Sequence, residues 1–331
     1  MFAVETERLT KRFRQLNGYR DLVTYPWRRP STIAVDSVSI RVREGELFGV
    51  LGENGAGKTT LLRMLSTTLL PTSGRAAVHG HDVVSDARAV RSEIGLVSGD
   101  ERSFYWRLSG RRNLEYFAAL YHLRRHVARQ RIDILLHALG AASYADRRFD
   151  SYSSGMRQKF AIARAMLTQP RVLFLDEPTR ALDPIAADEV RQYVTEEIIG
   201  RLGHTVLLAT HMLSEAQALS NRIAIIRHGK VFAEGTIDEL TDRMMLSNTV
   251  ELVIRGAADM ASDAVRQTAG VGAITVLPER DGARLRVNFA SADGTLDRLL
   301  RAVMETGAHV ESCVTQRPSL DDVYRAAHAI G

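Results

Sequence analysis

One run of eight residues limits the possible folds of this chain more than any other feature. Residues 52–59 read Gly-Glu-Asn-Gly-Ala-Gly-Lys-Thr and fit the P-loop pattern G-x-x-x-x-G-K-[ST] at every fixed position. A buried strand is predicted before this run, at 46–51, and a helix after it, at 60–65. Glycines let successive backbone N–H groups point into one concavity, which the positive end of the helix also faces. The sequence therefore predicts a phosphate-binding loop inside an α/β fold.

The side chains of this loop predict contacts with a nucleotide and a metal ion. Lys58 is expected to reach the β- and γ-phosphates, and the Thr59 hydroxyl is expected to bind Mg²⁺. The residues expected to hold the nucleotide here are Gly52, Asn54, Gly55, Gly57, Lys58, Thr59 and Thr60.

Length and composition narrow the kind of protein. The 331 residues suggest about two domains. No apolar run approaches the roughly 18 residues that a membrane helix needs, and residues 1–14 lack an apolar signal core. We therefore expect a cytosolic chain whose membrane partner, if it has one, supplies the spanning segments. A net charge of +5 is too small to indicate a nucleic-acid partner, and the single cysteine, Cys313, excludes an internal disulfide.

The pattern of apolar residues divides the chain in two. Residues 1–240 alternate short apolar runs with helical patterns, which predicts a layered α/β domain. Residues 101–165 are mostly helical in period and predict a helical subdomain inside it. Residues 247–331 read β-α-β-β-α-β, which predicts a small α+β domain of the ferredoxin-like kind. Residues 17–30 interleave aromatic and arginine side chains, as in a loop that faces a membrane or permease or in an ordinary surface loop.

Two further motifs carry chemistry. Residues 172–178 read as a buried strand that ends in two acids, where Asp176 can hold Mg²⁺ and Glu177 can accept a proton from an attacking water. Residues 152–159 read as a polar turn that opens a helix, and a serine at a helix start can bind an anion.

Together these motifs resemble the ATP-binding subunit of an ABC transporter over about residues 4–240. Gly52–Thr59 resembles the Walker A motif, and Asp176 and Glu177 resemble the Walker B aspartate and the catalytic glutamate. The resemblance also implies roles for the signature residues Ser153, Ser154 and Gly155, the D-loop residue Asp183, the switch histidine His211 and the adenine-stacking residue Phe13.

The resemblance implies a cofactor, partners and a location. ATP and Mg²⁺ would lie between the Walker A of one subunit and the signature of another in a head-to-tail homodimer, with Lys58, Glu177 and His211 as the catalytic residues. Hydrolysis would drive a separate transmembrane permease at the cytoplasmic face of the membrane. The signature and the appended domain are similar to those of type-2 exporters of drugs, lipids or polysaccharides. The alternative is a soluble ABC-type ATPase that acts on ribosomes or nucleic acid, although such proteins usually carry two cassettes or long coiled coils.

Three positions depart from the pattern of that family. Ser154 stands at the second position of the usual Ser-Gly-Gly-Gln, where the family has glycine, and Met156 replaces the glutamine. After the strand that ends near Ser98, where the family carries a glutamine, this chain has Asp100 and Glu101. Either acid is a candidate to replace it, with Asp100 as the candidate Mg²⁺ ligand.

The aromatic run 104–106 lies where the family receives a permease helix. Phe104, Tyr105 and Trp106 stand side by side there, among several arginines. Aromatic and arginine side chains make good interface anchors, so we expect a socket for the permease. Buried anchors of the helical subdomain are the other interpretation.

Overall fold

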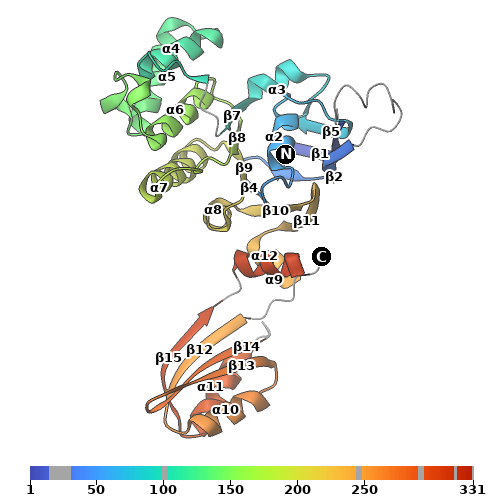
Figure 1. Cartoon of the computed structure of the whole chain (residues 1–331), viewed down its shortest axis with the longest axis vertical. Coiled ribbons are helices and arrows are strands. Elements are labelled where there is room, and N and C mark those ends of the chain that lie inside the picture. Colours follow the sequence, from blue (N-terminus) through green and yellow to red (C-terminus); the bar gives the residue numbers. More distant parts are fainter. Residues whose placement is uncertain (15–30, 99–102, 244–247, 290–293, 317–318, 330–331) are drawn as a thin grey trace, which may run out of the picture. The chain divides into compact units, whose positions relative to one another are not determined.

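The computed structural model describes residues 1–14, 31–98, 103–243, 248–289, 294–316 and 319–329. The chain divides into two compact units, Met1–Thr236 and Ile237–Gly331 (Figure 1). The predicted loop at 17–30 and the acids Asp100 and Glu101 lie outside the described residues. Among the described residues, no helix combines the length and the apolar character needed to cross a membrane.

A six-stranded sheet forms the centre of the first unit, in the order β11-β10-β4-β9-β8-β7. Its strands are β4 (Leu47–Leu51), β7 (Ile94–Ser98), β8 (Val172–Asp176), β9 (Thr205–Thr210), β10 (Arg222–Arg227) and β11 (Lys230–Gly235). All neighbours are parallel except β10 and β11. Every residue of β4 and β9 is buried, as expected for parallel strands that are covered on both faces.

Alternate side chains of the central sheet pack into two hydrophobic cores, one on each face. Leu173 and Leu175 of β8 pack into the core shared with the helical subdomain. Val172 and Phe174 point the other way, into a core formed with helix α2 (Lys58–Leu65) and a second, antiparallel sheet. That sheet contains β1 (Phe2–Arg14), β2 (Ser31–Val38), β3 (Arg41–Arg43), β5 (Ser73–Val78) and β6 (His81–Asp82).

The remaining helices of the first unit lie beyond the two sheets. Helix α3 (Ala87–Glu93) precedes β7. The stretch expected to be a helical subdomain contains α4 (Gly110–Leu120), α5 (Arg125–Ala138), the short 3₁₀ helices at 142–144 and 149–151, and α6 (Ser154–Met166). Next come α7 (Pro184–Gln192), which continues as a π-helix over 193–201, and α8 (Leu213–Leu219). Phe149 is fully buried and anchors the subdomain through four aromatic neighbours.

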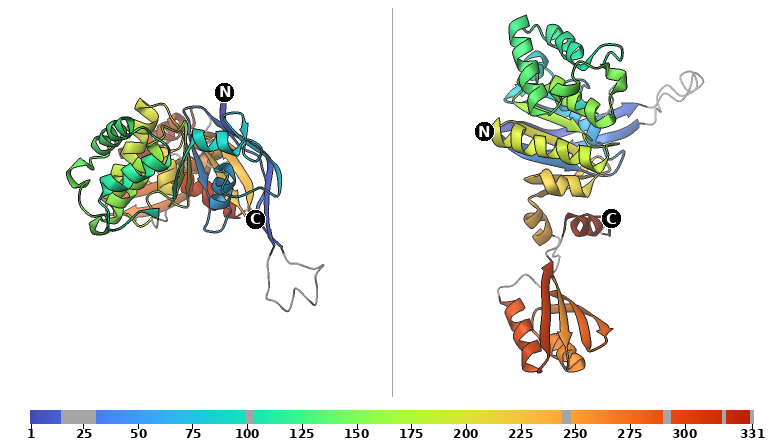
Figure 2. Two further views of the ribbon diagram at one scale, coloured as in Figure 1. Left: turned by 90° about the horizontal axis from the view of Figure 1, so that it is seen from above. Right: turned by 90° about the vertical axis from the view of Figure 1, so that its left-hand side faces the viewer.

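The second unit has its own sheet and core (Figure 2). Its elements are α9 (Ile237–Arg243), β12 (Asn248–Arg255), α10 (Ala258–Gln267), β13 (Val271–Glu279), β14 (Gly282–Phe289), α11 (Thr295–Glu305), β15 (His309–Gln316) and α12 (Leu320–Ala329). The antiparallel order is β13-β14-β12-β15, and α10 and α11 pack together beside it. From β12 to β15 the elements follow the β-α-β-β-α-β order that the sequence predicts. The sequence placed the end of the first domain at 240, whereas the compact units meet between 236 and 237.

Candidate functional site

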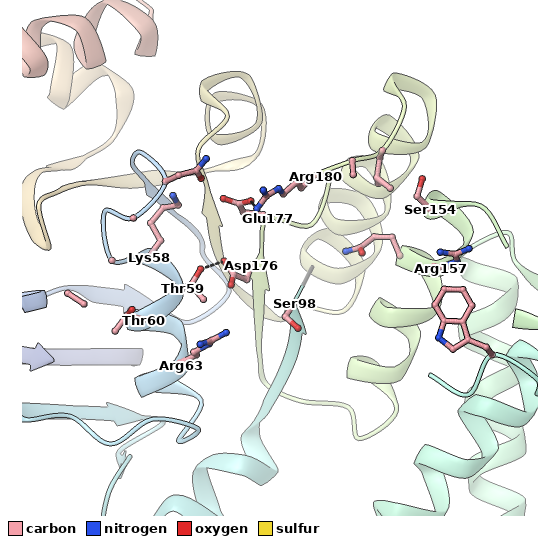
Figure 3. Close-up of a pocket in the computed structure, with 18 residues that line it drawn as sticks. Lys58, Thr59, Thr60, Arg63, Ser98, Ser154, Arg157, Asp176, Glu177 and Arg180 are labelled. Atoms are coloured by element: carbon pink, nitrogen blue, oxygen red, sulfur yellow. Dashed lines mark hydrogen bonds and ion pairs between the residues drawn. The ribbon is translucent and has the colours of Figure 1, made fainter. Parts of the chain in front are cut away.

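A cavity of about 990 Å³ in the first unit contains most of the predicted site residues. In Figure 3, Lys58 and Thr59 lie on one side of this space, Asp176 and Glu177 beside them, and Ser154 and Arg157 across from them. The predicted residues that line it are Asn54, Gly55, Gly57, Lys58, Thr59, Thr60, Ser154, Asp176 and Glu177. Segments far apart in the sequence therefore meet here because the ends of parallel strands share one edge of the sheet.

Two glycines of the loop at 52–59, Gly52 and Gly57, are required by close packing. Gly57 has a φ of 110°, and a Cβ there would lie 2.3 Å from the carbonyl oxygen of Ala34. A Cβ on Gly52 would lie 2.4 Å from the carbonyl oxygen of Ile226. Any larger residue at either position must therefore displace the loop from β2 or β10.

Lys58 is the first residue of α2, and its side chain folds back over its own loop. The ammonium donates hydrogen bonds to the carbonyl oxygens of Gly52 at 2.8 Å and Glu53 at 2.9 Å. Burial lowers the pKa of Lys58, while the negative charges of Glu177 and Asp176 raise it. A phosphate bound at the loop would add favourable negative charge beside this ammonium.

Thr59 and Asp176 form a pair of oxygen donors suited to a hard cation. The Thr59 hydroxyl donates to the Asp176 carboxylate at 3.1 Å, although the two residues lie 117 positions apart. Burial raises the pKa of Asp176, and the hydrogen bond from Thr59 opposes that shift. Mg²⁺ prefers carboxylate and hydroxyl oxygens, so the chemistry of this pair fits that ion. The structure brings together the two residues that the sequence predicted as its ligands.

Glu177 is held by two basic side chains. Its Oε1 lies 3.1 Å from His211 Nδ1, and its Oε2 accepts a hydrogen bond from Arg180 at 2.9 Å. The φ of Glu177 is 51°, a left-handed conformation that is uncommon outside glycine and frequent at functional sites. The sequence predicted Glu177 and His211 but missed Arg180. Its spacing of three residues from Glu177, in the turn after the strand, was the available signal.

The predicted signature residues start α6, and each has a structural part. Ser153 is the N-cap residue, and its hydroxyl accepts a hydrogen bond from the Met156 N–H at 3.3 Å. Gly155 packs against α7, where a Cβ would lie 2.7 Å from the Cβ of Ala186. Asp183 caps α7 in the same way, accepting from the Ala186 N–H at 3.0 Å. Ser154 alone of the three signature residues lines the cavity.

Phe13 stands apart from the residues just described. It is exposed on β1, and the Lys11 ammonium lies 5.3 Å from the centre of its ring. Among the described residues, the lining of the cavity does not include it. Adenine stacking on Phe13 and Mg²⁺ binding by Asp100 stay predictions.

The aromatic run 104–106 is divided between core and surface. Phe104 is buried and stacks on Phe149 with ring centres 4.5 Å apart. Tyr105 is exposed, and Trp106 is 43% exposed with the Arg157 guanidinium 4.6 Å from its ring centre. Phe104 is therefore a buried anchor of the helical subdomain, whereas Tyr105 and Trp106 are exposed at the surface.

Comparisons with known proteins agree with this geometry. Residues 35–180 match the family model described as ABC transporter. The daunorubicin resistance ATP-binding protein DrrA3 of Streptomyces coeruleorubidus is 41% identical over 292 residues, which cover 88% of this chain and 90% of the relative. The doxorubicin resistance ATP-binding protein DrrA of Mycobacterium tuberculosis is 39% identical over 301 residues, 89% of this chain and 88% of the relative. Both matches are longer than the first unit, so they extend into the second.

Solved structures show the same fold in the first unit. CbiO1 of Clostridium perfringens, described as part of an ABC transporter complex, matches with a TM-score of 0.61 and 26% identity over 71% of this chain and 88% of its own. A dimeric ATP-binding cassette bound to ADP and phosphate matches with a TM-score of 0.60 and 24% identity over 70% of this chain and 98% of its own. These relatives agree with the geometry of the P-loop and of the acids at the end of β8. The chain is an ATP-binding protein of the ABC transporter family.

Proposed function

We propose that this chain hydrolyses ATP to drive the export of a small molecule through a separate permease that spans the membrane. The observation that carries the proposal is the convergence in one cavity of Lys58, the Thr59–Asp176 pair and Glu177. These groups supply phosphate binding, metal binding and a general base, which are the needs of ATP hydrolysis.

Each side chain has a part that its chemistry allows. The P-loop amides and the Lys58 ammonium bind the phosphates. Glu177 orients the attacking water and takes its proton, and His211, at 3.1 Å from Glu177, fixes the direction of that carboxylate. Thr59 and Asp176 would hold Mg²⁺, which supplies neutralisation of phosphate charge when it is bound.

The substrate proposal comes from the relatives. DrrA3 and DrrA carry names of daunorubicin and doxorubicin resistance proteins, and both match this chain over more than 85% of its length. We infer that this chain also powers the removal of a toxic organic compound. None of the relatives reported above is described as acting on ribosomes or nucleic acid, so the soluble alternative has no observation in its favour.

Two partners belong to this proposal. A second copy of the chain would complete the ATP site, with Ser153 and Ser154 of one copy facing the P-loop of the other. A permease would dock at the surface that carries Tyr105 and Trp106, since both side chains are exposed and Arg157 of α6 lies over the Trp106 ring. Through that permease the chain would lie at the cytoplasmic face of the membrane.

The decisive experiment combines turnover with partner identification. Wild-type protein should hydrolyse ATP in the presence of Mg²⁺, and Glu177→Gln should reduce turnover by about 10²- to 10⁴-fold while ATP binding persists. Purification from the native host in mild detergent should recover an integral membrane protein in stoichiometric amount. Recovery of ribosomes or DNA without a membrane protein would contradict the export proposal, even if ATP turnover were normal.

A further inference from the structure

One buried polar group in the nucleotide cavity has no partner that the structure describes. Gln158 lies in α6 and is only 4% exposed. Its Nε2 atom is buried and, among the described residues, makes no hydrogen bond. The same side chain lines the cavity together with Lys58, Asp176 and Glu177. A buried unpaired donor costs stability, and native proteins keep few of them, so this one calls for a functional explanation.

The position of Gln158 defines what could satisfy it. Helix α6 packs against β7, whose last residue, Ser98, pairs in register with Asp176. Ser98 also lines the cavity, and Figure 3 shows it across from Thr59 and near Asp176. Gln158 therefore belongs to the wall of the cavity that β7 and α6 form, while Lys58 and Thr59 belong to the opposite wall. A nucleotide bound to the P-loop would lie in the space between these walls, with its terminal phosphates beside Lys58.

We propose that the Nε2 amide of Gln158 donates a hydrogen bond to the γ-phosphate of the ATP that is bound to the P-loop of the same chain. This proposal rests on the proposed function and deepens it, because it makes Gln158 a group that distinguishes ATP from ADP. The donor has the right chemistry, since phosphate oxygens are strong acceptors and hydrogen bonds to charged groups are among the stronger ones. ADP lacks the acceptor, so the amide returns to an unpaired state after hydrolysis and phosphate release.

Methionine at position 158 tests this role with little change of volume. Gln158→Met removes the donor, and Gln130→Met is the matched control, because Gln130 is exposed on α5 and away from the cavity wall. The measurement is calorimetric titration with Mg²⁺-ADP and with a Mg²⁺-bound non-hydrolysable ATP analogue, at protein concentrations where light scattering reports a monomer. We expect Gln158→Met to weaken analogue binding by roughly tenfold, the effect of one hydrogen bond to a charged group, with ADP binding unchanged.

Thermal unfolding without nucleotide gives a second readout that a merely structural role would not produce. Because methionine replaces an unpaired buried donor by an apolar group, Gln158→Met should unfold at the same temperature as wild type or at a higher one. A lower unfolding temperature together with equal losses for ADP and the ATP analogue would show that Gln158 is structural and overturn the proposal. An unchanged preference for the analogue over ADP would overturn it as well.

The same titrations separate this proposal from the proposed function. Lys58→Ala should abolish binding of both nucleotides if the chain is an ATPase of the proposed kind. Wild-type protein that bound neither nucleotide would refute the proposed function itself. Normal nucleotide binding by wild type, lost in Lys58→Ala and unaffected in Gln158→Met, would refute only the role of Gln158.

Discussion

At the scale of single residues, burial shifts the pKa values of two oppositely charged side chains that line the same cavity. It lowers the pKa of Lys58 and raises the pKa of Asp176, so each group is moved toward its neutral form. Both must be charged to bind a phosphate and a metal ion. The protein therefore carries a cost in its folded state that a bound nucleotide and cation would offset, as is common where activity and stability compete.

Asp176→Asn should reveal that cost. Since the folded-state pKa of Asp176 lies above its ordinary value, ionisation of this group destabilises the fold as the pH rises through that folded-state pKa. Asparagine can still accept the hydrogen bond from Thr59 but carries no charge. We expect Asp176→Asn to unfold at a higher temperature than wild type at pH 7, in a chelator and without nucleotide. The difference should vanish as the pH approaches about 4, near the ordinary pKa of aspartate.

The opposite result has a clear meaning. A lower unfolding temperature for Asp176→Asn at pH 7 would show that attraction between this carboxylate and Lys58 exceeds the cost of burial. In either case Asp176→Asn should lose the Mg²⁺ dependence of ATP binding.

The same scale shows what the sequence could predict of the site. Lys58, Thr59, Asp176 and Glu177 were predictable because each belongs to a short motif with fixed spacing. Gln158 was not singled out from the sequence. It lines a cavity together with the end of β7, 60 residues earlier, and the sequence does not reveal which face of α6 meets that strand.

At the scale of elements, the N-cap of helix α6 combines an observed role with a proposed one. Ser153 caps the helix through the Met156 N–H, and Ser109 caps α4 through the Arg112 N–H with the same 3.3 Å distance. Loss of either cap should lower the free energy of unfolding by about 1 kcal/mol. The two helices therefore offer a matched pair of variants.

Ser153→Ala should also reduce ATP turnover, because the proposed dimer places this hydroxyl at the nucleotide of the other copy. Ser109→Ala should leave turnover near the wild-type value. Turnover is measured at saturating ATP, alongside unfolding in urea for both variants. Equal turnover in the two variants would limit Ser153 to its role as a cap.

The segment before α4 illustrates a limit of sequence reasoning. Adjacent aromatic residues in an irregular segment have no periodicity that separates a buried side chain from an exposed one. Phe104 is buried against Phe149, whereas Trp106 is 43% exposed. Only the tertiary contacts determine which of the two side chains is buried.

Trp106→Ala tests the proposed permease surface. Trp106 is 43% exposed, so its loss should leave the free energy of unfolding of the isolated subunit nearly unchanged. In a complex with the permease, the same variant should lose most transport or resistance activity. Phe104→Ala is the contrasting variant, since truncation of a buried phenylalanine costs about 3–5 kcal/mol. A Trp106→Ala variant that unfolds like Phe104→Ala would contradict the surface role.

At the scale of the whole molecule, the two units have separate cores. Among the described residues, the first unit's clusters end at Val231, and the second unit's cluster begins at Val250. The β-α-β-β-α-β order of the second unit was predictable from its apolar patterns, whereas for the first unit the sequence indicated only an alternation of strands and helices. The boundary was less predictable, because α9 carries no composition change that assigns it to either side.

Separate cores predict separate unfolding transitions. A ligand at 100 times its dissociation constant stabilises the unit that binds it by about 2.7 kcal/mol. A non-hydrolysable ATP analogue with Mg²⁺ should therefore raise the transition of residues 1–236 by roughly 5–10 °C and leave the other transition in place. Differential scanning calorimetry measures both, with Lys58→Ala as the control that removes the shift. A single transition that moves as a whole would show that the units unfold together.

The contact between Arg157 and Trp106 has an optical consequence. The chain has two tryptophans: Trp106 lines the cavity, and Trp27 lies outside the described residues. Indole emission depends on the charge and the water around the ring, and here a guanidinium lies 4.6 Å from the ring centre. With Trp27→Phe the protein would hold a single tryptophan, at the wall of the proposed nucleotide site. Arrival and departure of ATP could then be followed in real time, without a label.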